Sequence, residues 1–354
     1  MFNPKISVIV PIYNVSSNLK EALESLKNQT FKEMEIILVN DASTDDSVKI
    51  AKEFLTDKRF SLINKSINEG LSSARNTGIK FAKGDWVYFF DSDDKLPINL
   101  FEILSKFFDK DIDMISFNYC DLVPGLKKIN TFQEKGVYSN VQAMDMLIEN
   151  RIEVAPWSYI CKRSILENNS SIRFPISRNF EDISYNVKLI NKVNKLLVLS
   201  CSPGGYFYRA GRPNSISNDV RGRKLKKQID DKLYLNDFKY KFLCRNKNLY
   251  DLDKINKWYF LELINLYLEY YPICKKNDIS EYNKLFTKIR QQMLYINSNS
   301  KILTKLKIKE KIKYYLIMHS RFLNLYFKIK NNYFKHDNSA FLHKLLCEKR
   351  CFNL

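Results

Sequence analysis

The chain has 354 residues, of which 45% are apolar and 14% aromatic, enough for one large domain with an appendage or for two domains. This composition excludes a disordered chain. No stretch approaches the roughly 20 apolar residues that span a bilayer. The first residues lack the basic lead and the small-residue cleavage site of a secretory signal, so no such signal is expected.

The charge divides the chain into two parts. Residues 221–354 hold 30 basic and 12 acidic side chains, a net charge of +18, whereas residues 1–220 hold 28 and 27, a net charge of +1. The two parts are therefore expected to have different partners. The seven cysteines form no C-x-x-C pair, which argues against a zinc site and a disulfide framework and favours a reducing cytoplasm.

The first hundred residues alternate between short apolar runs and amphipathic stretches. In the first amphipathic stretch, Leu19, Ala22, Leu23 and Leu26 form the stripe of a helix. By the same reasoning, strands are predicted within 5–14, 34–41, 59–66 and 85–94, and helices within 16–30, 47–57 and 70–84, the last one closed by Gly84 as a C-cap. Such alternation indicates a parallel sheet with helices on both faces.

The remaining chain has two different patterns. Strand-like pieces occur at 112–119, 196–200 and 205–210, with helices near 140–150 and 182–191, and the pattern is helical from about 221 onward. Together with the change in charge, this predicts an α/β domain over residues 1–218 and a basic, mainly helical region over 219–354.

Polar clusters follow three of the first four predicted strands: Tyr13-Asn14, Asn40-Asp41 and Asp91–Asp94. Open parallel sheets bind ligands at the carboxyl ends of their strands, so these clusters are expected to meet at one edge. The third cluster ends the stretch VYFFDSDDKL and crowds three aspartates into four positions. A solvated turn, with Ser92 or Asp94 as a helix cap, is one explanation. A divalent cation that neutralises the repulsion is the other, and the neighbouring clusters favour it.

Several stretches, in this order and spacing, resemble the family 2 glycosyltransferases of the GT-A fold. Within the first hundred residues they are ISVIVPIYN, LVNDASTDDS, NEGLSSARNTGI and FFDSDD, and further on WSYICKRSIL, NFEDISYNVKLI and YFYRAGRPNSIS. The resemblance is strong over residues 4–100, continues to about 216 and does not include the basic region. It implies a Rossmann-like, mostly parallel sheet flanked by helices.

The resemblance implies a set of donor-binding residues. Pro11 and Tyr13 match the loop that frames the nucleotide base, with Tyr13 stacking on uracil, and Asp41 matches the acidic residue that accepts from the uracil N3–H. The family's Asp-Asp-Gly is Asn40-Asp41-Ala42 here. This difference leaves the geometry of the loop open, and it leaves open that the donor carries another nucleotide. Arg75 matches a position near the donor; the alternative is an arginine on the helix surface.

The aspartates after the fourth strand match the family's D-x-D motif. The resemblance implies that Asp91 and Asp93 bind Mn²⁺ or Mg²⁺ at the diphosphate of a UDP-sugar, and Asp91 and Ser92 are expected to contact the donor. Hard oxygen ligands suit such a cation, which offsets the phosphate charge as UDP leaves.

Glu181-Asp182 matches the family's E-D segment, in which the aspartate is the catalytic base. Asp182 would accept a proton from the acceptor hydroxyl as that oxygen attacks the anomeric carbon, which inverts its configuration. The alternative is that Asp182 only caps the helix that begins there. No histidine occurs in residues 1–318, so the obvious alternative base is missing.

Three further residues are expected near the acceptor. Trp157 would stack on a sugar ring or belong to the core, and Glu181 adjoins the predicted base. Arg209, like Ser215, matches a family loop that closes over the donor, although a plain surface arginine is an alternative.

The expected function is therefore metal-dependent, inverting transfer of a hexose or N-acetylhexosamine from a UDP-sugar to a glycan or lipid-linked glycan in cell-surface polysaccharide synthesis. The alternatives are another nucleotide-sugar donor and a non-catalytic glycan- or membrane-binding protein. Residues 301–330 mix Lys with Ile, Leu and Tyr at approximate helical spacing, which suits an anionic membrane surface, a solvated helical bundle or a homo-oligomer contact. No nucleic-acid motif accompanies them, so no nucleic-acid partner is expected, and the protein is placed at the inner face of the cytoplasmic membrane.

Overall fold

The computed structural model describes residues 3–123, 126–130, 135–152, 155–202, 204–209, 222–276, 282–319, 322–323 and 326–327. The contacts divide the chain into two compact units, residues 1–258 and 259–354. The predicted boundary at 218–219 lies outside the described residues and stays a prediction.

The first hundred residues form the strands and helices that the sequence predicts. The strands are β1 (Ile6–Ile12), β2 (Met34–Asn40), β3 (Phe60–Asn64) and β4 (Trp86–Phe89). The predicted helices are α1 (Ser16–Lys27), α2 (Ser47–Glu53) with the 3₁₀ turn η1 (Phe54–Thr56), and α3 (Leu71–Phe81). A further short helix that was not predicted, α4 (Leu100–Ser105), follows β4.

The rest of the first unit mixes strands and helices before it becomes helical. Its strands are β5 (Met114–Phe117), β6 (Tyr119–Val123), β7 (Leu126–Asn130), β8 (Gly136–Ser139), β9 (Tyr159–Lys162), β10 (Lys195–Leu199) and β11 (Phe207–Tyr208). Its helices are α5 (Asn140–Ile148), the 3₁₀ turn η2 (Pro156–Ser158), α6 (Arg163–Glu167), α7 (Asp182–Ile190) and α8 (Gly222–Arg245), and α9 (Leu252–Lys276) begins in it.

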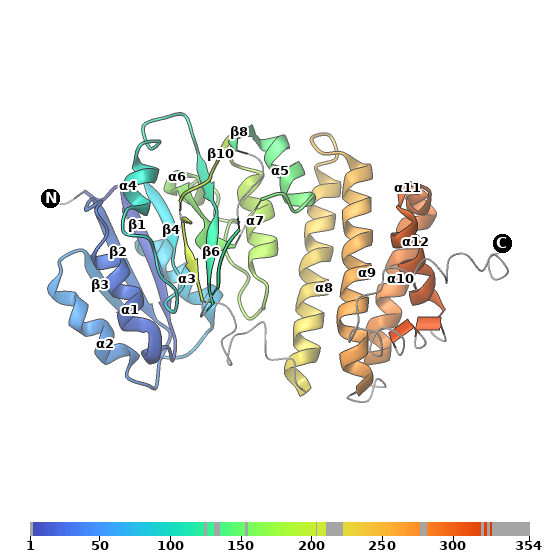
Figure 1. Cartoon of the computed structure of the whole chain (residues 1–354), viewed down its shortest axis with the longest axis horizontal. Coiled ribbons are helices and arrows are strands. Elements are labelled where there is room, and N and C mark those ends of the chain that lie inside the picture. Colours follow the sequence, from blue (N-terminus) through green and yellow to red (C-terminus); the bar gives the residue numbers. More distant parts are fainter. Residues whose placement is uncertain are drawn as a thin grey trace. The chain divides into compact units, whose positions relative to one another are not determined.

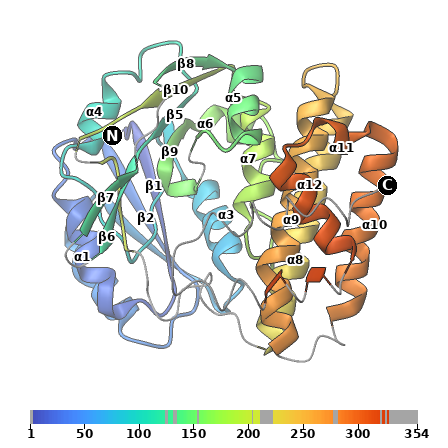
Figure 2. The ribbon, with the colours of Figure 1, turned by 45° about the vertical axis from the view of Figure 1, so that its right-hand side comes forward.

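The central sheet has eight strands in the order β3-β2-β1-β4-β9-β5-β10-β8 (Figures 1 and 2). The strands β3, β2, β1 and β4 are parallel to one another, and β10 is parallel to β5. Strand β9 is antiparallel to both of its neighbours, and β8 is antiparallel to β10. The sheet is thus mostly parallel and flanked by helices, which confirms the predicted α/β class.

Helices cover the two faces of this sheet because its strands are apolar on both sides. The core on one face joins alternate residues of β1, such as Val8 and Val10, to the buried stripe of α1 and to Phe101 of α4. On the other face Ile9 contacts α3, as strand alternation requires. Figure 2 shows α1 and α3 on opposite sides of β1 and β2.

Two glycines let α3 and its exit lie close to the sheet. A Cβ at Gly78 would fall 2.3 Å from Cγ2 of Ile9, and one at Gly84 would fall 2.5 Å from the carbonyl carbon of Ile6. The prediction that Gly84 caps α3 is wrong, because the helix ends at Phe81 with Ala82 as its C-cap. Gly84 is instead required by its close approach to the backbone of β1.

A small second sheet, in the order β11-β6-β7, lies beside the loop that follows β4. A bridge between Lys95 and Phe207 joins β11 to this loop. The pairing brings residues 206–209 next to the aspartates at 91–94, although the two segments are far apart in sequence.

The residues that the structure describes in the second unit are mainly helical. It contains the remainder of α9 and α10 (Asn283–Ser300), α11 (Ile302–Lys305) and α12 (Ile308–Met318). Aromatic contacts form part of its core, for example Tyr267 with Phe286 and Phe260 with Tyr314. In the described ranges, none of the helices combines the length and the apolar character needed to cross a membrane.

Candidate functional site

The predicted clusters meet at the carboxyl edge of three neighbouring strands, β2, β1 and β4. The backbone N–H of Asp41 donates to the carbonyl of Ile12 at the end of β1 (2.9 Å), and that of Phe90 donates to Ile9 (2.9 Å). The loops that carry Tyr13, Asp41 and Asp91 therefore leave the sheet side by side.

Asp41 is buried and holds the loop that leads into α3. Its Oδ1 accepts from Nζ of Lys65 (2.6 Å) and from the N–H of Glu69 (3.2 Å), and its Oδ2 accepts from the N–H of Gly70 (2.6 Å). Lys65 also donates to Ser73 (2.9 Å). Burial disfavours the Lys65 ammonium, but its bonds to Asp41 and Glu69 outweigh this effect and raise the Lys65 pKa.

The loops after β1 and β2 are linked by hydrogen bonds and leave Tyr13 open to solvent. Oδ1 of Asn14 accepts from the N–H of Thr44 (2.8 Å), and the N–H of Asn14 donates to the hydroxyl of Ser43 (3.2 Å). Pro11 is buried within β1, whereas Tyr13 is 48% exposed. The tyrosine ring is therefore available to a ligand at this edge.

Arg75 lies at the centre of the site. It is only 2% exposed, so the alternative of a surface arginine is wrong. Its Nη2 donates to Oδ1 of Asp91 (2.8 Å) and its Nη1 to Oε1 of Glu181 (2.5 Å), while its guanidinium lies 5.2 Å from the ring centre of Phe174. Burial opposes the charge, but the two carboxylates outweigh burial and raise the pKa of Arg75. Arg75 thus connects the loop after β4 to the start of α7.

Asp94, the last aspartate of the cluster, anchors the turn from within. Its Oδ2 accepts from the hydroxyl of Tyr206 (2.7 Å) and its Oδ1 from the N–H of Arg209 (2.7 Å). Burial, followed by the charge of Asp91, raises the pKa of Asp94 to about 7. The sequence analysis included Asp94 in the aspartate cluster and offered it only a helix-capping role, but the N-cap of α4 is Asn99. The partners of Asp94 come from the segment that contains β11.

Arg209 lies against the turn. Its Nε donates to the carbonyl of Asp93 (3.0 Å), and its Nη2 pairs with Oε2 of Glu21 on α1 (2.6 Å). Arg209 therefore fixes the position of the turn from the side of β11. Ser215, predicted in the same loop, lies outside the described residues.

The turn leaves two carboxylates partly exposed, those of Asp91 and Asp93, while Ser92 and Asp94 are buried. Mg²⁺ is often held by one or two carboxylates, with the remaining ligands coming from substrate phosphates and water. Within the ranges that the structure describes, no three Asp, Glu, His or Cys side chains form a complete metal cage. The donor set of Asp91 and Asp93 fits a cation that is shared with a phosphate-bearing ligand.

Asp182 is the first residue of α7 and lies directly after the Arg75–Glu181 ion pair. Burial, followed by the charge of Glu181, raises the Asp182 pKa to about 7, against the opposing effect of Arg75. A carboxylate with a pKa near neutrality both accepts and releases protons readily at that pH.

Trp157 is 8% exposed and belongs to an aromatic cluster behind the turn. Its ring stacks on Tyr206, with 4.4 Å between the ring centres, and on Tyr208, at 5.5 Å. Through Tyr206, this cluster is hydrogen-bonded to Asp94. The structure therefore places Trp157 in the core that supports the turn.

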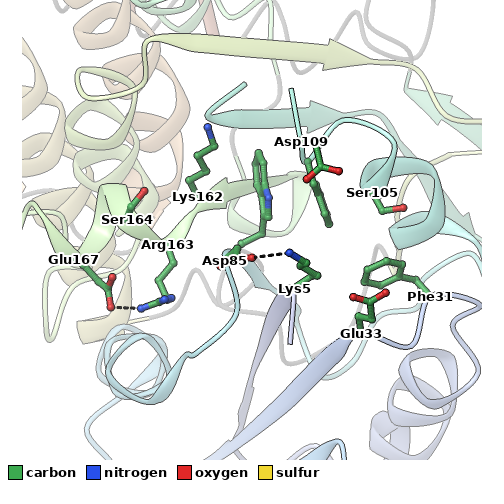
Figure 3. A pocket seen from close by; sticks show the side chains of 12 residues that line it. Lys5, Phe31, Glu33, Asp85, Ser105, Asp109, Lys162, Arg163, Ser164 and Glu167 are labelled. Carbon is green, nitrogen blue, oxygen red and sulfur yellow. Dashed lines mark hydrogen bonds and ion pairs between the residues drawn. The ribbon is translucent and has the colours of Figure 1, made fainter. Parts of the chain in front are cut away.

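A hollow of about 390 Å³ lies near the opposite edge of the sheet, where β1 and β4 begin (Figure 3). None of the predicted site residues lines it. Its charged side chains include the ion pairs Lys5–Asp85 and Arg163–Glu167. The predicted chemistry is therefore concentrated at the carboxyl edge.

Comparison with known proteins agrees with this arrangement. The family model described as Glycosyl transferase family 2 matches residues 7–150. An uncharacterized glycosyltransferase of Haemophilus influenzae is 30% identical over 222 residues, which cover 62% of this chain and 84% of that protein. The chain belongs to glycosyl transferase family 2. The predicted family membership is thereby confirmed.

The chain matches only part of the length of several other family 2 relatives. The minor teichoic acid biosynthesis protein GgaB of Bacillus subtilis is 31% identical over 86% of this chain but only 34% of its own length. The chain spans 32%, 54% and 63% of three further curated relatives. Among solved structures, residues 1–349 of TarS from S. aureus share the fold, with a TM-score of 0.60 at 18% identity over 95% of this chain and 93% of that chain.

The Asn40-Asp41-Ala42 departure from the family pattern has a structural cost. Ala42 has φ 59°, in the left-handed region, where glycine is free of steric penalty. We therefore expect Ala42→Gly to raise the free energy of unfolding by about 0.5–1 kcal/mol, net of the extra chain entropy of glycine. Denaturant titration with an unchanged m-value would measure this.

The matched control for that substitution is Gly70→Ala in the neighbouring loop. Gly70 has φ 88°, so an added Cβ is strained there even though, apart from the adjoining residues, no atom of the described chain lies within 4 Å of it. The control should lower stability. Equal effects of the two substitutions would show that backbone strain at Ala42 is not the cause.

Proposed function

We propose that the protein is a metal-dependent, inverting glycosyltransferase that moves a hexose or N-acetylhexosamine from a UDP-sugar to a hydroxyl of a glycan or lipid-linked glycan. The observation that carries this proposal is the Arg75 ion cluster. It brings Asp91, the first residue of the D-x-D turn, into one site with the Glu181-Asp182 segment.

The donor is proposed to lie across the carboxyl edge of β1, β2 and β4. Tyr13 would stack on the base, next to Pro11, and Oδ2 of Asp41, which accepts a single bond from Gly70, would accept a second from the N3–H of uracil. TarS of S. aureus, whose fold is similar, has been solved with UDP-GlcNAc. GgaB is named for teichoic acid biosynthesis, which supports a cell-surface polysaccharide as the product.

Asp91 and Asp93 would hold Mn²⁺ or Mg²⁺, with Ser92 close to the donor between them. When bound, such a cation offsets negative charge on the diphosphate of the leaving UDP. The protein's own contribution is to keep the turn rigid. Asp94, Tyr206 and Arg209 do this through the hydrogen bonds described above.

Asp182 is proposed to accept the proton of the acceptor hydroxyl. That oxygen then forms a bond to the anomeric carbon as the bond from this carbon to the UDP oxygen breaks, so a single displacement inverts the configuration. The raised pKa of Asp182 suits this role, since a carboxylate near pKa 7 is a stronger base than an ordinary aspartate.

Donor turnover tests this proposal. Incubated with nucleotide sugars and Mn²⁺ or Mg²⁺, the protein should release UDP from one UDP-sugar, and a chelator should stop the release. Asp93→Asn should reduce turnover roughly 100-fold or more, since a catalytic cation contributes several kcal/mol. Asp109→Asn, at the hollow on the opposite edge, should leave turnover unchanged. The proposal is contradicted if UDP release continues in the presence of chelator. It is also contradicted if the folded protein releases UDP from no UDP-sugar.

The activity should depend on pH through Asp182. Because the base must be ionised, kcat should fall as the pH drops through about 7, well above the ordinary Asp value of 3.8. Asp182→Asn should cost between about 10²- and 10⁴-fold in kcat. A flat kcat between pH 5 and 8, or full turnover by the variant, would rule out this base.

The same pKa shift provides a folding control. Because the pKa of Asp182 is higher in the folded protein than in the unfolded chain, ionisation of Asp182 opposes folding. Its contribution therefore lowers the free energy of unfolding as the pH rises from about 4 to 7. Asp182→Asn should therefore be more stable than the parent at pH 8. A loss of activity in a stabilised variant cannot be attributed to misfolding.

We further propose that the second unit places the enzyme on the inner face of the cytoplasmic membrane. Residues 282–319 contain nine Lys or Arg and one acidic residue. Apolar side chains lie exposed among them, including Tyr295 (65%) and Ile308 (68%). Basic side chains interleaved with exposed apolar ones favour an anionic bilayer surface.

Vesicle sedimentation tests the membrane contact. The protein should bind phosphatidylcholine vesicles only when they contain phosphatidylglycerol, and binding should weaken with salt. Lys309→Glu with Lys311→Glu should weaken it roughly tenfold or more, at about 1 kcal/mol for each lost charge. The control is Lys20→Glu with Lys52→Glu, two exposed positions on the first unit, which should leave vesicle binding unchanged. Equal vesicle binding by the two double variants would contradict the membrane role. So would a dimer that forms without vesicles and is lost in the Lys309→Glu, Lys311→Glu variant.

A further inference from the structure

Helix α8 carries a buried carboxylate that faces the loop before the proposed base. Asp231 is 2% exposed and belongs to α8, which packs beside α7 (Figure 1). Its Oδ1 accepts from Nη1 of Arg178 (2.9 Å), and its Oδ2 accepts from the backbone N–H of Asn179 (3.0 Å) and from Nζ of Lys227 (2.7 Å). Two of these three donors belong to the loop.

This loop has a backbone conformation that its residues disfavour. Ser177 has φ 64° and Phe180 has φ 57°, both in the left-handed region, and neither is glycine. Residues persist in such conformations only where the surroundings hold them there, and they concentrate at functional sites. The loop therefore needs an external restraint.

Helix α8 supplies this restraint along the loop. Nζ of Lys227 donates to the carbonyl of Ser177 (2.6 Å). The guanidinium of Arg178 lies 3.8 Å from the ring centre of Tyr234, and Nζ of Lys232 lies 5.5 Å from that of Phe180. Each residue from 177 to 180 thus contacts α8, with the Asp231 carboxylate holding the middle two.

The restraint acts on the chain just before Asp182. Asn179, whose N–H is bound by Asp231, precedes Asp182 by only three positions, and Phe180 turns the chain between them. On the side of the sheet, Glu181 is held by Arg75. Asp182 therefore emerges from a short segment that is fixed on one side by the buried Arg75 and on the other by the buried Asp231, whose cationic partners are partly exposed.

We propose that Asp231 is a positioning residue for catalysis: it holds residues 177–180 in the conformation that presents Asp182 to the acceptor hydroxyl. The inference rests on the proposed function, in which Asp182 is the base, and deepens it. Helix α8 lies beyond residues 7–150, which match the family model, so part of the catalytic geometry comes from the basic helical region. A displacement of about 1 Å at a reacting group can lower the rate about 100-fold.

The test compares Asp231→Asn and Asp231→Ala with Asp230→Ala. Asp230 is the preceding residue on the same helix, but it is exposed, and its side chain has no hydrogen bond or ion pair with the residues that the structure describes. Asp231→Asn keeps the size and an acceptor for the Asn179 N–H while losing the charge that pairs with Arg178 and Lys227. Two readouts are needed: amide hydrogen exchange over residues 177–183, and kcat and KM for the donor.

The expected results separate positioning from general stability. Asp231→Ala should speed exchange over 177–183 at least tenfold, without similar change in the sheet, and lower kcat roughly 10- to 100-fold with donor KM unchanged. Asp231→Asn should give a smaller loss in kcat, and Asp230→Ala should match the parent in both readouts. If Asp231→Ala does not fold, Asp231→Asn and Arg178→Met decide by the same criteria.

Two results would overturn the inference. One is unchanged exchange over 177–183 in the Asp231 variants, and the other is a fall in kcat matched by a rise in donor KM and by faster exchange throughout the domain. A parent protein without turnover would refute the proposed function instead. The exchange measurement would then still decide whether Asp231 holds the loop.

Discussion

The site depends on one buried cation. Arg75 is removed from solvent and shared by Asp91 and Glu181, two carboxylates from segments that are distant in sequence. Leaving the Arg75 guanidinium buried without these partners would cost far more than an exposed ion pair contributes. Arg75 of α3 therefore fixes the D-x-D turn and the proposed base relative to each other.

Around this centre, each reactive group is held from a second direction. The turn is anchored by Asp94 to the second sheet, and the loop before Asp182 is anchored to α8. Such double support is what a site needs when small displacements of its groups lower the rate. It also accounts for aromatic residues such as Trp157, whose burial behind the turn keeps Tyr206 in place.

The sequence predicted features that a short stretch of chain determines by itself. The strands β1 to β4 and their helices follow from local periodicity, and the meeting of polar clusters follows from the parallel topology. The partners of Arg75, the anchoring of Asp94 and the contact of Lys65 with Asp41 join segments far apart in sequence, for which a single sequence has no signal. The left-handed conformation of Ala42 and the placement of β9 were missed because neither shows in residue type or spacing.

The antiparallel strand β9 in the middle of the sheet constrains how the protein is made. During synthesis β4 emerges long before Tyr159–Lys162, so its outer edge has no partner until the ribosome has added the intervening chain. An unpaired strand edge is a template for pairing with other chains. The nascent chain is therefore most exposed to aggregation between the synthesis of β4 and that of β9. A chain truncated before residue 159 would keep this unpaired strand edge permanently.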